Sequence, residues 1–145
     1  MNWPGPDRWQ KLWSAIGATG NSAEWYETLT RAYTEKHRHY HNQQHIADCL
    51  AEFDPVRRLA TKPDLVEFAL WFHDAVYDTH AADNEEQSAA LACRCLESAG
   101  RTDIVDKVGE LIMATKLHKS ADSDDELSDL IHDIRTSRGL ETTTR

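Results

Sequence analysis

The sequence lacks the features that mark membrane and secreted proteins. Its longest wholly apolar run is the segment 68–72, far shorter than the roughly 20 residues that a membrane-spanning helix needs. Residues 1–6 contain neither a basic cluster nor an apolar stretch, so they predict no signal peptide. We therefore expect a cytoplasmic protein with no membrane partner.

Cysteine is scarce as well. The three cysteines are Cys49, Cys93 and Cys95, and no C-x-x-C motif is present, which argues against a disulfide framework. Cys93 and Cys95 lie two residues apart in a predicted helix, so they point to nearly opposite sides and cannot share one metal ion. We expect reduced thiols buried in the core, which suits a cytosolic protein.

The chain also lacks a stripe of lysine and arginine. Its formal net charge is -9 and its pI is near 5.3. An acidic surface disfavours nucleic-acid binding, whose affinity comes largely from neutralising phosphates. Small anionic substrates are not excluded, because a bound metal ion supplies local positive charge whatever the overall balance.

Helical patterns fill most of the 145 residues, and no alternating strand pattern of useful length appears. The length predicts one domain, and we expect an all-α bundle of about six to seven helices over residues 1–135. Residues 136–145 contain one apolar residue, Leu140, and are predicted to be a disordered tail. The predicted helices begin near Pro6, Ser22, His45, Pro63, Asn84, Asp103 and Asp124.

One predicted helix, from Asp64 to His73, is apolar almost all round. A helix of that kind is normally buried at the centre of a domain. The ionisable pair His73-Asp74 follows its apolar run directly, and such a pair needs a compensating partner when it is buried. A metal ion is a natural partner for it.

A second histidine pattern precedes this helix. His41 and His45 lie four residues apart within Tyr40-His41-Asn42-Gln43-Gln44-His45. His45 and the pair His73-Asp74 can converge on one divalent ion, and imidazole with carboxylate suits a metal that activates water. The alternative is that these histidines are surface or hydrogen-bonded core residues, as isolated histidines usually are.

Four short motifs of the sequence resemble motifs of the HD-domain metal-dependent phosphohydrolases, in particular those of a small bacterial branch of predicted HD phosphohydrolases. The resemblance covers most of residues 8 to 120. The matching segments are R-H-Y-H-N-Q-Q-H-I at 38–46, W-F-H-D-A-V-Y-D at 71–78, D-N-E-E-Q-S-A at 83–89 and I-M-A-T-K-L-H at 112–118. It implies an HD-type helical fold and hydrolysis of a phosphoester or phosphoanhydride in a small molecule, with a nucleotide favoured.

The resemblance also implies roles for individual residues. His45, His73 and Asp74 would bind the metal, and Asp74 or Asp78 would orient or deprotonate the attacking water. His41 would protonate the leaving group, by analogy with the cyclic-nucleotide phosphodiesterases, which have a motif similar to Y-H-N-Q-Q-H at 40–45. The residues implied to hold phosphate are Arg38, Lys116 and His118.

The fourth metal ligand of the family is an aspartate on a late helix, and the sequence departs from the family there. Arg135 occupies the best-matching position, and Asp133, the residue that we predict as the ligand, lies two residues earlier. His132 or Asp129 are alternatives. The family's last helix is also missing, which would expose apolar surface, so we expect a homodimer.

Three hypotheses follow. The leading one is an enzyme with one divalent ion, for which Mn, Fe, Co, Ni, Mg and Zn are equally compatible with the ligands. The second is a regulatory or binding module of HD type with a broken site, supported by Arg135 at the ligand position. The third is a helical scaffold whose histidines only pack.

Overall fold

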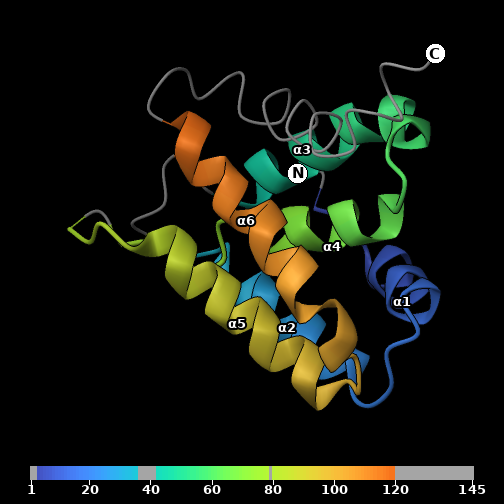
Figure 1. The fold of residues 1–145 in the computed structure, drawn as a ribbon. Coiled ribbons are helices and arrows are strands. Elements are labelled where there is room, and N and C mark those ends of the chain that lie inside the picture. Colours follow the sequence, from blue (N-terminus) through green and yellow to red (C-terminus); the bar gives the residue numbers. More distant parts are fainter. Residues whose placement is uncertain (1–2, 36–41, 79, 120–145) are drawn as a thin grey trace.

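Six α-helices and two 3₁₀ helices make up the part of the chain that the computed structural model describes, residues 3–35, 42–78 and 80–119, with side chains as far as residue 114 (Figure 1). No strand occurs within these ranges, which confirms the predicted all-α class. The elements are α1 (Pro6–Ala15), α2 (Ser22–Ala32), α3 (Gln43–Phe53), η1 (Asp54–Leu59), α4 (Pro63–Phe72), α5 (Asn84–Ser98), η2 (Thr102–Ile104) and α6 (Val105–Lys119). None of these helices is long and apolar enough to cross a lipid bilayer.

Helix α4 is the centre of the fold, as its apolar sequence predicts. Every residue from Leu65 to Phe72 is buried, and α4 contacts α1, α3, α5 and α6. Figure 1 shows α5 and α6 side by side, and both pack against α4. A helix covered on all sides has little freedom to shift, so the residues at its end are held in place.

Aromatic side chains fix α1 against α4. The Trp9 ring stacks on Phe68 with 5.8 Å between centroids and lies 5.0 Å from the Trp71 ring. Phe68 and Phe72 stack at 4.9 Å. Such pairs add to the burial of large apolar area, and they hold the register between the two helices.

Helix starts follow the local signals of the sequence. The side chains of Asn21 and Asn42 cap α2 and α3, and proline occupies the first turn of α1 and of α4, where its missing N–H costs nothing. Asp103 is an exception to the prediction, because it lies within η2 and not at the cap of α6. Helix α3 ends at Phe53, close to Pro55, and the chain continues as the 3₁₀ helix η1.

Candidate metal centre

Helix α3 carries two donor side chains one turn apart. Asn42 accepts a hydrogen bond from the backbone N–H of His45 at 3.1 Å, which places His45 in the first turn of the helix. Cys49 follows four residues later and therefore lies on the same face. The Cys49 side chain is buried, with 5 % of the residue exposed, and His45 is partly buried.

The segment just after α4 carries two more donor side chains. His73 and Asp74 follow the last turn of α4 and are each 1 % exposed. The hydroxyl of Tyr33 donates a hydrogen bond to the carbonyl of Trp71 at 2.7 Å and accepts one from the backbone N–H of Asp74 at 3.3 Å. This buried hydroxyl thus fixes the backbone on both sides of His73.

A backbone contact sets the tautomer of His73. Its Nδ1 lies 2.7 Å from the carbonyl oxygen of Leu70. A carbonyl can only accept a hydrogen bond, so Nδ1 carries the proton. In a neutral imidazole the lone pair is then on Nε2, and a hydrogen bond of this kind orients histidines that bind metals.

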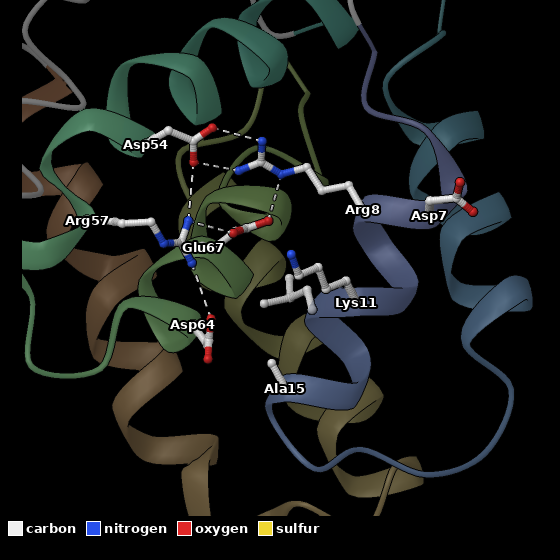
Figure 2. Close-up of a pocket in the computed structure, with 9 residues that line it drawn as sticks. Asp7, Arg8, Lys11, Ala15, Asp54, Arg57, Asp64 and Glu67 are labelled. Atoms are coloured by element: carbon white, nitrogen blue, oxygen red, sulfur yellow. Dashed lines mark hydrogen bonds and ion pairs between the residues drawn. The ribbon is translucent and has the colours of Figure 1, made fainter.

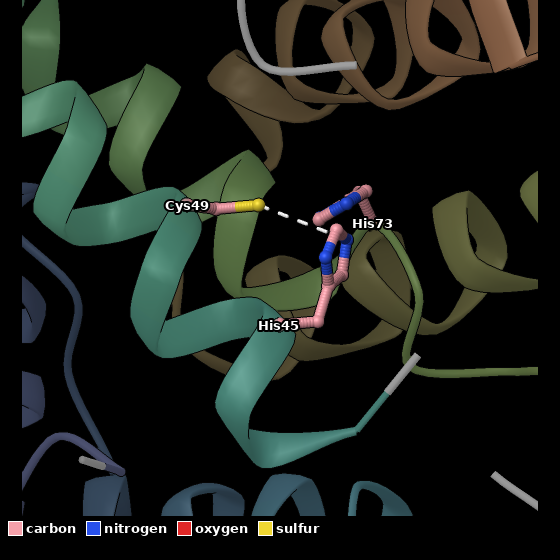
Figure 3. A group of neighbouring side chains, drawn as sticks. All are labelled: His45, Cys49 and His73. Atoms are coloured by element: carbon pink, nitrogen blue, oxygen red, sulfur yellow. Dashed lines mark hydrogen bonds between the residues drawn. The ribbon is translucent and has the colours of Figure 1, made fainter. Parts of the chain in front are cut away.

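The four side chains converge. The Asp74 Oδ2 atom lies 3.3 Å from Nε2 of His45 and 3.5 Å from Nε2 of His73. The Sγ atom of Cys49 lies 3.7 Å from the same Nε2 of His45. One donor atom each from His45, Cys49 and His73 lies within 4.8 Å of the other two, so these three residues can hold a metal ion (Figure 3).

These separations fit a shared ion. With metal–ligand bonds of about 2.0 to 2.2 Å, a nitrogen and an oxygen bound tetrahedrally to one metal lie about 3.3 Å apart. The two contacts of Asp74 Oδ2, at 3.3 and 3.5 Å, agree with that value. Two imidazoles and a carboxylate are also a donor set that divalent transition metals accept.

The structure therefore brings together His45, His73 and Asp74, three of the four residues that the sequence predicts as ligands. The fourth, Asp133, lies outside the described residues. So do Arg38 and His41, and the side chains of Lys116 and His118, so the predictions for them stay predictions.

Asp78 is described, and it lies in the turn that follows the pair. Its carboxylate is exposed, and Oδ1 accepts a hydrogen bond from the backbone N–H of His80 at 2.9 Å. The Asn84 side chain accepts a hydrogen bond from the backbone N–H of Asp78 at 3.1 Å and donates one to the backbone carbonyl of Asp78 at 3.0 Å. These contacts give Asp78 a part in shaping the turn, and its predicted role toward water stays a prediction.

Ser88 fastens the segment between the pair and this turn. Its hydroxyl accepts a hydrogen bond from the backbone N–H of Val76 at 3.0 Å and lies 3.3 Å from the carbonyl of the same residue. Ser88 belongs to α5 and is fully buried. The chain leaving His73 and Asp74 is thus attached to a second helix.

Charged side chains form a separate cluster near the start of α4. A cavity of about 540 Å³ is lined there by Arg8, Arg57, Asp54, Asp64 and Glu67 among others (Figure 2). Burial alone would lower the pKa of Arg8, but hydrogen bonds to Asp54 and Glu67 and the charges of both raise it above its ordinary value. None of the residues of the metal cluster lines this cavity.

Cys49 is the member of the cluster that the sequence did not indicate as a ligand. It was expected to be a buried core thiol, and it is buried and not in a disulfide, but its sulfur faces His45. The available signal was the spacing of four residues between His45 and Cys49, which is typical of two ligands on one helix face.

No protein-family model, curated protein or solved structure matches the chain. What the chain does must therefore be inferred from its own residues and their arrangement.

Proposed function

We propose that the chain is a metal-dependent phosphohydrolase acting on a small phosphorylated molecule, with a nucleotide favoured. The observation that carries the proposal is the meeting of Nε2 of His45 and Nε2 of His73 at one oxygen of Asp74, at 3.3 and 3.5 Å. The order of these residues along the chain resembles that of the HD-domain phosphohydrolases.

The electrostatics of this meeting point favour a cation. The proton on Nδ1 of His73 leaves a lone pair on Nε2 of the neutral ring. That lone pair faces a carboxylate oxygen, and two lone pairs that face each other repel. A positive charge between them, either a proton or a metal ion, removes the repulsion, and burial makes its removal more important.

A bound divalent ion supplies a Lewis acid for the phosphoryl oxygen and lowers the pKa of water. The chain's own residues would do the rest. Asp74 or Asp78 would orient the attacking water or accept its proton, and His41 would protonate the leaving oxygen. The side chains of Arg38, Lys116 and His118 would hold the phosphate.

The test combines metal analysis with a turnover screen. The full chain is stripped with chelator, reloaded with one of Mn, Fe, Co, Ni, Mg or Zn, and assayed on a phosphomonoester, a cyclic nucleotide and a pyrophosphate. We expect turnover that needs the metal and falls by at least about 10³-fold in a His73→Ala/Asp74→Ala double variant, because a metal contributes several kcal/mol to catalysis.

The matched control is the His80→Ala/Asp83→Ala double variant, which removes the same residue types from exposed positions outside the cluster. It should keep both metal and turnover. Turnover that persists in the metal-free His73→Ala/Asp74→Ala protein would refute the proposed mechanism.

A second candidate function is a metal-binding module without catalysis. It is favoured by the thiol of Cys49, which lies within 4.8 Å of a donor atom of His45 and of His73, because structural metal sites have four protein ligands whereas catalytic sites keep a position open. Metal in stoichiometric amount with no turnover in the same screen would support it.

A further inference from the structure

Among the described residues, Asp74 and Cys49 both lie beside the same ring nitrogen of His45. Nε2 lies 3.3 Å from Oδ2 of Asp74 and 3.7 Å from Sγ of Cys49. A hydrogen bond to the carboxylate requires a proton on Nε2, whereas a hydrogen bond from the thiol requires a lone pair there. One nitrogen cannot meet both requirements at once, and an Nε2 proton shared by the two groups would meet sulfur only as a weak acceptor, so a hydrogen-bonded chain fits these contacts poorly.

The same geometry argues against a nucleophilic cysteine activated by histidine. In a Cys-His-Asp arrangement the two ring nitrogens have different partners, one the nucleophile and the other the carboxylate. Here the thiol and the carboxylate face the same nitrogen. A cation among the three groups, in contrast, is compatible with all of them.

We propose that Cys49 is a protein ligand of the metal centre, which therefore selects a thiophilic divalent ion such as zinc or cobalt over magnesium and manganese. The inference rests on the metal centre of the proposed function but not on hydrolysis. The 3.7 Å between Sγ and Nε2 of His45 is close to the about 3.6 Å expected for sulfur and nitrogen on one tetrahedral ion.

The chemistry of the ligands gives this preference. Thiolate is a soft donor that favours zinc and similar ions, whereas magnesium and manganese prefer oxygen ligands. As the sulfur–metal bond forms, the Cys49 thiol releases its proton to solvent.

The decisive measurement is the absorption spectrum of the full chain loaded with cobalt. Bands in the visible report that cobalt is bound, and a thiolate-to-cobalt charge-transfer band in the near ultraviolet reports that sulfur is a ligand. We expect both in the wild type. Cys49→Ser should lose the near-ultraviolet band and bind zinc at least about 10- to 100-fold more weakly, the loss that follows from removing even an outer partner of a metal ligand.

Cys95→Ser is the matched control. Cys95 is as buried as Cys49 but belongs to α5, and burial raises the pKa of its thiol, which keeps it protonated. This variant should keep both bands. If Cys49→Ser does not fold, Cys49→Ala and the wild-type spectrum still answer the question, since the charge-transfer band is either present in the wild type or absent.

The outcomes separate the proposals. Visible bands without charge transfer in the wild type would overturn the role of Cys49 and leave the metal centre standing, as would a charge-transfer band that survives in Cys49→Ser. An absence of both bands would overturn the metal centre itself. Both bands with no turnover would support Cys49 as a ligand and count against hydrolysis.

Discussion

One buried carboxylate lies in the N-terminal half of α4 and another lies just past the C-terminal end, and their partners differ in kind. Glu67, which is 5 % exposed, accepts hydrogen bonds from Arg8 at 2.9 Å and from Arg57 at 3.0 Å (Figure 2). Asp74, which is 1 % exposed, faces the ring nitrogens of His45 and His73. Glu67 is bonded to guanidinium groups, which are permanently charged. Asp74 faces imidazole rings, which carry a charge only when both of their nitrogens are protonated.

This difference separates a cluster of structural ion pairs from the candidate metal site. A guanidinium stays protonated at every pH a protein meets, so Glu67 is compensated in the folded chain without help from outside. Neutral imidazoles and a thiol are ligands, and they offer lone pairs to an ion that arrives from solution. The carboxylate within α4 is therefore suited to holding the fold together, and the one just past the end of α4 is suited to receiving a cation.

The largest expected effect comes from Asp74→Asn, which keeps the shape of the side chain and removes its charge. We expect it to abolish metal binding and with it the activity. The metal-free variant should be about as stable as the metal-free wild type, because the asparagine amide can donate a hydrogen bond to the lone pair on Nε2 of His73, which the carboxylate oxygen of Asp74 only faces. Metal at 100 times its Kd should stabilise the wild type alone, by about 2.7 kcal/mol.

Urea unfolding with chelator and with zinc measures both parts of this prediction. A loss of several kcal/mol in the metal-free variant would mean that Asp74 is a structural ion-pair partner like Glu67. The contrast between the two ends of α4 would then disappear.

The second prediction is the reciprocal change, Glu67→Gln. It should lower the free energy of unfolding by about 1.5 to 3 kcal/mol, the range for hydrogen bonds to charged groups. A larger loss is not expected, because Arg8 and Arg57 are each 31 % exposed in their side chains and keep bonds to Asp54. Zinc affinity, measured by competition with a chelating dye, should change by less than about twofold, since distant sites act independently.

The smallest effect concerns Asp54 and pH. Burial alone would raise the pKa of Asp54, but the hydrogen bonds and charges of Arg8 and Arg57 lower it below the ordinary 3.8. A lowered folded-state pKa stabilises the fold above the unfolded value, and this contribution is lost as pH falls through the folded value. The Asp54 side chain is 43 % exposed, so the contribution should be below about 1 kcal/mol.

Urea unfolding of the metal-free wild type and of Asp54→Asn at several pH values tests this sign. The gap between the two proteins should be full at pH 7 and close as the pH falls below 3.8. A gap that widens in acid would mean that Arg8 and Arg57 do not hold this carboxylate in solution.

Local signals in the sequence predict much of the fold. Proline in the first turn and asparagine at the cap mark the helix starts, and the apolar run before His73 predicts the burial of α4. The bonds from Arg8 to Asp54 and Glu67 join residues 46 and 59 positions apart, and no periodicity encodes such a pairing. Tertiary packing alone determines it.

The sequence also predicts, in part, which side chains the fold brings together at the candidate metal site. His45, His73 and Asp74 stand out because polar residues follow or interrupt apolar patterns. Cys49 does not stand out from the apolar pattern, because a cysteine at a core-facing helical position resembles any other small apolar residue. Only the position of α3 against α4 shows that its sulfur faces an imidazole.

All four donor residues lie in the single stretch of chain from His45, in α3, to Asp74, just after the end of α4. Contacts between segments so near in sequence form quickly, because little loop entropy is lost when they meet. The ligands can therefore assemble in the nascent chain before the helices that later enclose them have been added. An insertion or deletion in the connection after η1 would accordingly disturb the proposed metal site far more than one of equal length between α5 and α6.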